Sequence, residues 1–111
     1  LRYGVQVFGR GKVASNILIG LGESDSNVLE GVAELAAMGV VPSIRVLKVN
    51  PLNRPALEAA LRELRPVPPE RLLRLNVGAK KVLMGHGLST TTYRTMCHEC
   101  GCCDLVPFKD L

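Results

Sequence analysis

The stretch KVASNILIGLGES, residues 12–24, decides the fold of this 111-residue chain. Its centre, residues 13–19, is a short apolar run closed by glycine, which is the pattern of a buried parallel strand. The next segment, SDSNVLEGVAELAAMG, can be capped at Ser24, Asp25 or Ser26 and stops at Gly39, as a helix would. Helical spacing gives it an apolar face made of Val28, Val32, Leu35 and Ala36. The order is therefore strand, glycine turn, helix.

A second buried strand, SIRVLKV at residues 43–49, follows and ends before Asn50 and Pro51. Strand, crossover helix and strand in this order form a βαβ unit, in which the two strands are parallel and adjacent. Two parallel strands leave both outer edges of their sheet unpaired. We therefore expect the sheet to be completed by a missing N-terminal half or by another copy in a homo-oligomer.

Two more helices are expected after the second strand. The first, at residues 53–66, has Asn53 as its cap, Pro55 in its first turn and Pro66 as its stop. The second lies within residues 68–87 and ends at the glycines near its C-terminus. The side chains expected to face inwards are Leu57, Leu61 and Leu64 in the first helix, and Leu72, Leu75 or Asn76, Ala79, Val82 and Leu83 in the second.

The composition is that of an ordinary globular protein, with 47% hydrophobic and 22% charged residues. The net charge of +4 comes from dispersed arginines, without the basic run and interleaved aromatics of a nucleic-acid surface. No apolar run approaches the roughly 20 residues of a membrane span, and no signal peptide is visible. We expect a cytoplasmic protein with neither nucleic acid nor a membrane as its partner.

The glycine turn GLGES, residues 20–24, lies at the carboxyl end of a parallel strand, where open α/β sheets and barrels bind ligands. Glycines let a ligand approach the backbone, and amides at a helix N-terminus favour an anionic group. Gly-x-Gly also occurs as a simple tight connection, and the dinucleotide fingerprint is not completed here. We expect Glu23 to cap or anchor this turn.

Two motifs together carry a family resemblance. ILIGLGES, followed by SIRVLKVNPLNRPALEA, resembles the second half of radical S-adenosylmethionine enzymes of the biotin synthase and methylornithine synthase type. In that family a strand ending in an Ile-x-Gly-Leu-Gly-Glu-like motif precedes a helix and a strand reading Ile-Arg-Val, with a proline soon after. The resemblance covers residues 9–87, and the matching positions are residues 18–23, residues 44–46, Pro51 and residues 55–57.

This resemblance implies that residues 1–87 are the C-terminal part, βαβαα, of a partial TIM-type (βα)6 barrel. It also implies S-adenosylmethionine as the cofactor, with its adenosine against the glycine turn and its adenine near Leu47. Arg45 interrupts an apolar strand, so it faces a polar barrel lumen or lies on an outer face with a partner. The expected cofactor-binding residues are Leu18, Gly20, Leu21, Gly22, Arg45 and Leu47.

The chain departs from that family in its catalytic cluster motif. Radical S-adenosylmethionine enzymes hold an iron–sulfur cluster on Cys-x-x-x-Cys-x-x-Cys in the first βα loop, and this sequence has no such motif. We therefore expect no reductive cleavage of S-adenosylmethionine by the chain alone, and we assign it no catalytic residue and no substrate.

All four cysteines lie in the C-terminal tail, residues 88–111, which has no helical or strand period. They are Cys97, Cys100, Cys102 and Cys103. Cys-x-x-Cys spacing lets two thiolates chelate one metal, and four thiolates suit zinc or an iron–sulfur cluster. Free thiols and disulfides are the alternatives. A metal centre would order a tail that has no other regular structure.

Two functions fit these patterns. The first is the C-terminal part of a radical S-adenosylmethionine, iron–sulfur protein that contributes adenosine-binding strands and a cysteine-rich metal loop. The second is a stand-alone, small metal-binding α/β module, completed by oligomerisation and not an enzyme.

Overall fold

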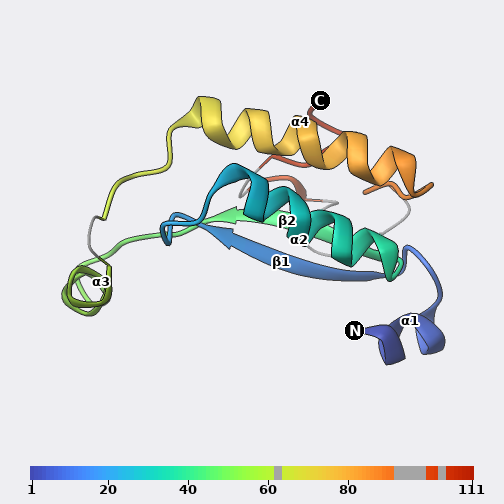
Figure 1. Ribbon diagram of the computed structural model, residues 1–111, viewed down its shortest axis with the longest axis horizontal. Coiled ribbons are helices and arrows are strands. Elements are labelled where there is room, and N and C mark those ends of the chain that lie inside the picture. Colours follow the sequence, from blue (N-terminus) through green and yellow to red (C-terminus); the bar gives the residue numbers. More distant parts are fainter. Residues whose placement is uncertain (62–63, 92–99, 103–104) are drawn as a thin grey trace.

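The chain is an α/β protein built on one parallel βαβ unit (Figure 1). The computed structural model describes residues 1–61, 64–91, 100–102 and 105–111. Its elements are α1 (Arg2–Phe8), β1 (Val13–Ile19), α2 (Asp25–Ala37), β2 (Val40–Val46), α3 (Arg54–Ala60) and α4 (Pro69–Gly85). The expected α/β class, the extent of the first strand and its parallel pairing with the second are confirmed.

The second strand begins and ends three residues earlier than predicted, and β2 contains Pro42. The register pairs Ser15 with Pro42 and Leu18 with Arg45. The amide of Leu47 donates to the carbonyl of Ile19 at 2.9 Å, and backbone groups alternate in direction along a strand. This alternation points the nitrogen of Pro42 away from β1, so the proline costs the sheet no hydrogen bond.

Helices α2 and α4 cover one face of the sheet (Figure 1). The core between these layers consists of Ile19, Val28, Val32, Ile44, Leu75 and Ala79, all buried. Each fully buried aliphatic side chain of this kind stabilises the fold by about 1.5–3 kcal/mol. The face predicted for α4 is confirmed, and that of α2 is confirmed except for Leu35, which is only partly buried while Leu29 packs against the core. Asn76 is buried beside Leu75, and its side-chain amide donates to the carbonyl of Leu72 at 2.9 Å.

The other face of the sheet carries the alternate side chains of both strands. Since Ile17, Ile19 and Ile44 pack towards the helices, Leu18 and Arg45 point to the opposite face. Leu18 is 44% exposed there, and Arg45 is partly buried. Arg45 therefore lies on the side of the sheet away from the helices.

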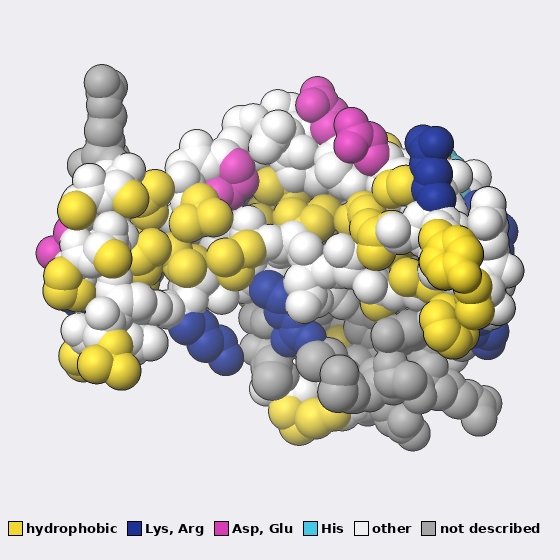
Figure 2. Space-filling model, turned by 90° about the horizontal axis from the view of Figure 1, so that it is seen from below, with side chains coloured by type: hydrophobic (Ala, Val, Ile, Leu, Met, Phe, Trp, Pro, Cys, Tyr) yellow, Lys and Arg dark blue, Asp and Glu magenta, His cyan; other side chains and the backbone are white. Residues whose placement is uncertain are grey.

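Helices α1 and α3 bury no residue. The predicted helix at residues 53–66 is wrong in extent, since α3 ends at Ala60 and Leu61 is extended. A seven-residue helix that buries nothing has little besides propensity to stabilise it. Helix α1 was not predicted from the sequence. Its large side chains leave an exposed hydrophobic surface at the N-terminal end of the chain, visible at the right of Figure 2, where Tyr3 is 77% and Phe8 is 70% exposed.

The last residues of the tail pack against the body of the protein. Val106 is buried, and Phe108 packs on the small cluster of Ala36, Leu83 and Leu88. Lys80 of α4 lies over the Phe108 ring, 5.3 Å from its centroid, and donates to the carbonyl of Leu111 at 2.7 Å. The end of the tail thus has apolar anchors of its own.

No helix of the described residues is long and apolar enough to cross a membrane.

Candidate functional site

The glycine turn connects β1 to α2 through two backbone conformations that favour glycine. Gly20 has φ of 108° and Gly22 has φ of 98°. Ser24 then caps α2, because its hydroxyl accepts a hydrogen bond from the amide of Asn27 at 3.2 Å. The predicted strand, glycine turn and helix are therefore present, with Ser24 as the cap among the three candidates.

Glu23 anchors this turn, as expected from the sequence. Its two carboxylate oxygens accept hydrogen bonds from the amides of Gly20 and Leu21, each at 2.8 Å. These two amides precede the N-terminus of α2, whose amides were expected to favour an anionic group. Because the side chain of Glu23 already supplies that negative charge, the amides are satisfied from within the chain.

A second layer of charge ties the turn to α4. Arg71 donates to the carboxylate of Glu23 at 3.1 Å and to its backbone carbonyl at 2.8 Å. The same guanidinium binds Asp25 at 2.7 Å, and Arg74 binds the other oxygen of Asp25 at 2.7 Å. The side chains of Arg71 and Glu23 are only 19% and 14% exposed. This network fixes the start of α2 against the start of α4.

The network also determines how its members titrate. Burial alone raises the pKa of Glu23, but hydrogen bonds from backbone amides and Arg71 outweigh it, so that the pKa lies below its ordinary value. Hydrogen bonds from Arg71 and Arg74 lower the pKa of Asp25. The hydrogen bond to Asp25 raises the pKa of Arg71. The two carboxylates are therefore charged at neutral pH and serve as structural acceptors.

A pocket of about 350 Å³ opens at the carboxyl ends of the two strands. Gly20 and Leu47, both predicted cofactor-binding residues, line it together. The remaining lining residues are Val46, Val49, Arg54, Leu64, Arg65, Pro66 and Val67. A Cβ atom added to Gly20 would lie 3.2 Å from Leu47 Cβ and 3.2 Å from Val67 Cγ2. Glycine at this position therefore leaves open the space between Leu47 and Val67 in the pocket.

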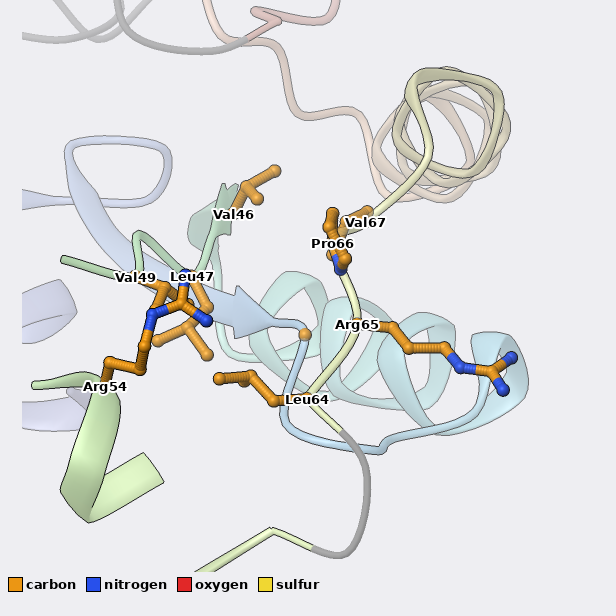
Figure 3. A pocket seen from close by; sticks show the side chains of 9 residues that line it. Val46, Leu47, Val49, Arg54, Leu64, Arg65, Pro66 and Val67 are labelled. Carbon is orange, nitrogen blue, oxygen red and sulfur yellow. The ribbon is translucent and has the colours of Figure 1, made fainter. Parts of the chain in front are cut away.

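The two arginines of the pocket point in different directions (Figure 3). Arg54, the first residue of α3, reaches back towards Leu47 and Val49, whereas the side chain of Arg65 extends away from them. The guanidinium of Arg54 is 3.3 Å from Glu58, and both side chains are more than half exposed. An ion pair this exposed contributes about 0–1 kcal/mol, so a ligand can compete for Arg54.

The other predicted cofactor residues lie elsewhere. Leu18 and Leu21 line a second hollow of about 400 Å³, whose lining comes from β1, the glycine turn and α2 and includes Glu30 and Glu34. Gly22 and Arg45 line neither of these two hollows. The structure thus brings together Gly20 and Leu47 from the predicted set and separates them from Leu18 and Leu21.

Two of the four predicted metal ligands are described, Cys100 and Cys102. Both side chains are exposed, and the Cys102 thiol donates to the Cys100 carbonyl at 3.4 Å. Hydrogen bonds from Cys102 lower the pKa of Cys100, with help from the charge of Lys109. Cys97 and Cys103 lie outside the described residues, within which no group of three His, Cys, Asp or Glu side chains could hold a metal ion.

The sequence analysis missed Arg54 and Arg71 as parts of this region. Arg71 is 46 residues from Asp25 along the chain, so no local pattern connects them. The available signal was the spacing of Arg71 and Arg74, which places two cations on one helix face.

Comparison with known protein families, with curated proteins and with solved structures gave no match to this chain.

Proposed function

We propose that this chain is the C-terminal part of a partial (βα)6 barrel in a radical S-adenosylmethionine protein of the biotin synthase type. Its pocket holds the adenosine of the cofactor. One observation carries this proposal: Gly20 and Leu47, from the ends of two adjacent parallel strands, line the same pocket. Ligands of parallel α/β folds bind at this end of the strands.

The pocket residues fit a nucleoside. The volume of about 350 Å³ lies within the usual range for small-molecule sites, and most of the walls are aliphatic. The missing side chain of Gly20 leaves backbone that a ligand can approach closely. In a barrel with α2 and α4 outside, Leu18 and Arg45 would face the lumen, where the substrate lies.

The chain's own residues bind and orient rather than react. When bound to a reduced iron–sulfur cluster, S-adenosylmethionine supplies a 5′-deoxyadenosyl radical. Leu47 and Val67 exclude water from the base, and Gly20 admits the nucleoside to the strand ends. Glu23 and Arg71 keep the turn in this shape without the ligand, since Glu23 accepts hydrogen bonds from the turn amides and Arg71 donates to the Glu23 carboxylate.

The test is an NMR titration of the chain with S-adenosylmethionine and with adenosine, observed at the amides of Gly20 and Leu47. We expect weak binding of both, because the amino-acid end of the cofactor is held by a cluster outside this chain. Val67→Trp should fill the pocket and abolish the response, whereas Leu18→Ala, outside the pocket, should leave it unchanged. Tight calorimetric binding of S-adenosylmethionine would contradict the assignment to part of a larger barrel.

A second function, a small metal-binding module completed by oligomerisation, is supported by the two exposed thiols at Cys100 and Cys102. In either case each strand of the two-stranded sheet has a single strand partner among the described residues, which favours assembly, so sedimentation at micromolar concentration should show a dimer or a larger oligomer. The coding sequence upstream of Leu1 separates the two functions. A Cys-x-x-x-Cys-x-x-Cys motif there supports the barrel, and a start codon at Leu1 supports the module.

A further inference from the structure

The pocket is a slot between two walls (Figure 3). One wall is formed by Leu47 and Val49, with Arg54 reaching over them. The other is formed by Pro66 and Val67, in the segment that leads to α4. Both walls are largely aliphatic, so a flat, weakly polar ligand group fills the space between them best.

Of the two arginines that line this slot, Arg54 is directed into it. Arg65 also belongs to the lining, but its side chain leads away from the opposite wall (Figure 3). A guanidinium is planar and weakly hydrated, and it stacks on aromatic faces, which an ammonium or an amide does less well.

We propose that Arg54 is a specificity-determining residue that stacks on the purine base of the bound nucleoside, against the aliphatic wall of Pro66 and Val67. This inference rests on the proposed function and names the part of the ligand that is recognised. It requires little reorganisation, because the Arg54 side chain is paired with the solvent-exposed carboxylate of Glu58. Glu58 then orients the guanidinium from its outer side.

The experiment is an NMR titration of the full chain with adenosine, observed at the Arg54 Nε–Hε group as well as at Gly20 and Leu47. Stacking places the Arg54 Hε in the shielding region of the base, so its resonance should move upfield. Arg54→Gln should weaken adenosine binding by about threefold to tenfold, the range of a cation–π contact. Arg54→Lys should weaken adenosine binding nearly as much, since lysine keeps the positive charge but lacks the planar guanidinium.

Arg65→Gln is the matched control, since it removes an arginine of the same pocket that points away from the slot. It should leave the affinity for adenosine within about twofold, as expected for a surface substitution. Circular dichroism melting of each variant separates loss of binding from loss of folding.

Three outcomes overturn the inference. In the first, adenosine moves Gly20 and Leu47 while the Arg54 signal stays in place and Arg54→Gln binds normally; the proposed function then stands. In the second, the Arg54 Hε moves downfield, which indicates a hydrogen bond to a polar ligand group. If adenosine shifts neither the Gly20 nor the Leu47 amide, the proposed function fails. Benzimidazole, a flat heteroaromatic without ribose, then tests Arg54 alone. The third outcome is that saturating benzimidazole causes no upfield shift of the Arg54 Hε resonance.

Discussion

The glycine turn and the C-terminal tail of this chain are held in place by different forces. The turn is fixed by charge: Glu23 satisfies its amides, and Arg71 ties it to α4. The end of the tail is fixed by apolar contact, chiefly through Val106 and Phe108. In the turn, the backbone amides are hydrogen-bonded within the chain, so the adjacent pocket has its shape without a ligand. In the tail, the side chains of Cys100 and Cys102 are exposed at the surface.

Metal removal should produce the largest effect in this comparison, and it should affect the tail only. A thiolate-bound metal supplies on the order of 10 kcal/mol in small zinc peptides. We expect anaerobically purified protein to contain zinc or iron, and chelation or Cys100→Ser to remove it and open the tail to protease. The same digests should leave the βαβ unit intact.

A negative result in that experiment is also informative. If elemental analysis finds less than about a tenth of an equivalent of any transition metal while the tail stays protected, the metal hypothesis fails. The contacts of Phe108 and Val106, or disulfides, would then account for the order of the tail.

Loss of Arg71 should produce the largest effect in the turn. Arg71→Met keeps the aliphatic stem but leaves Glu23 with a partly buried, uncompensated charge, which should cost about 1–3 kcal/mol of unfolding free energy. Arg74→Met is the matched control, because Arg74 shares Asp25 but is 64% exposed, and it should cost about 0–1 kcal/mol. Equal losses in urea denaturation would show that Glu23 does not depend on Arg71.

Substitution of Phe108 should weaken the tail to a smaller extent. Phe108→Ala removes a half-buried ring from the cluster of Leu83 and Leu88, and we expect it to cost about 1–2 kcal/mol. Phe8→Ala removes the same kind of ring from an exposed position on α1. Thermal unfolding should therefore show a change in the free energy of unfolding of about 0.5 kcal/mol or less. A tail that becomes no more sensitive to protease in Phe108→Ala would show that apolar anchoring is not what holds it.

The sequence was sufficient where the structure depends on local pattern. The first strand, the parallel pairing and the inward faces of α2 and α4 follow from periodicity and from glycine and serine at the element ends. The second strand was predicted three residues too late, whereas β2 begins at Val40 and includes Pro42, whose nitrogen faces away from β1. The predicted helix at residues 53–66 was too long because its leucines have helical spacing but no core to contact.

The candidate site was less predictable because its parts come from distant segments. Gly20 and Leu47 could be named from motifs, yet Pro66 and Val67 reach the same pocket only because α3 ends at Ala60. Likewise, the pairing of Arg71 with Asp25 depends on how α4 lies against α2. Periodicity predicts which face of a helix is buried, but it does not predict which end of another helix lies beside that face.

The smallest expected effect is a change in acid stability that originates in the turn. The folded-state pKa of Glu23 is lowered from its ordinary value of 4.5, by the hydrogen bonds that outweigh its burial. A lowered folded pKa means that the unfolded chain binds the proton more readily, so the contribution of Glu23 is complete above pH 4.5. It is then lost as the pH falls through the folded value. Asp25, whose pKa is lowered mainly by Arg71, acts in the same direction.

Glu23→Gln tests this contribution directly. The variant should be less stable than the parent at pH 7, and the difference between the two should shrink as the pH falls below 4.5, because the parent protonates the carboxyl that the variant lacks. Glu34→Gln, at an exposed position on α2, is the control for removing one negative charge. Denaturant midpoints measured between pH 3 and pH 7 give the comparison. A constant difference between parent and Glu23→Gln across that range would mean that the turn is held by its glycines and its cap, and that the charge of Glu23 contributes nothing to it.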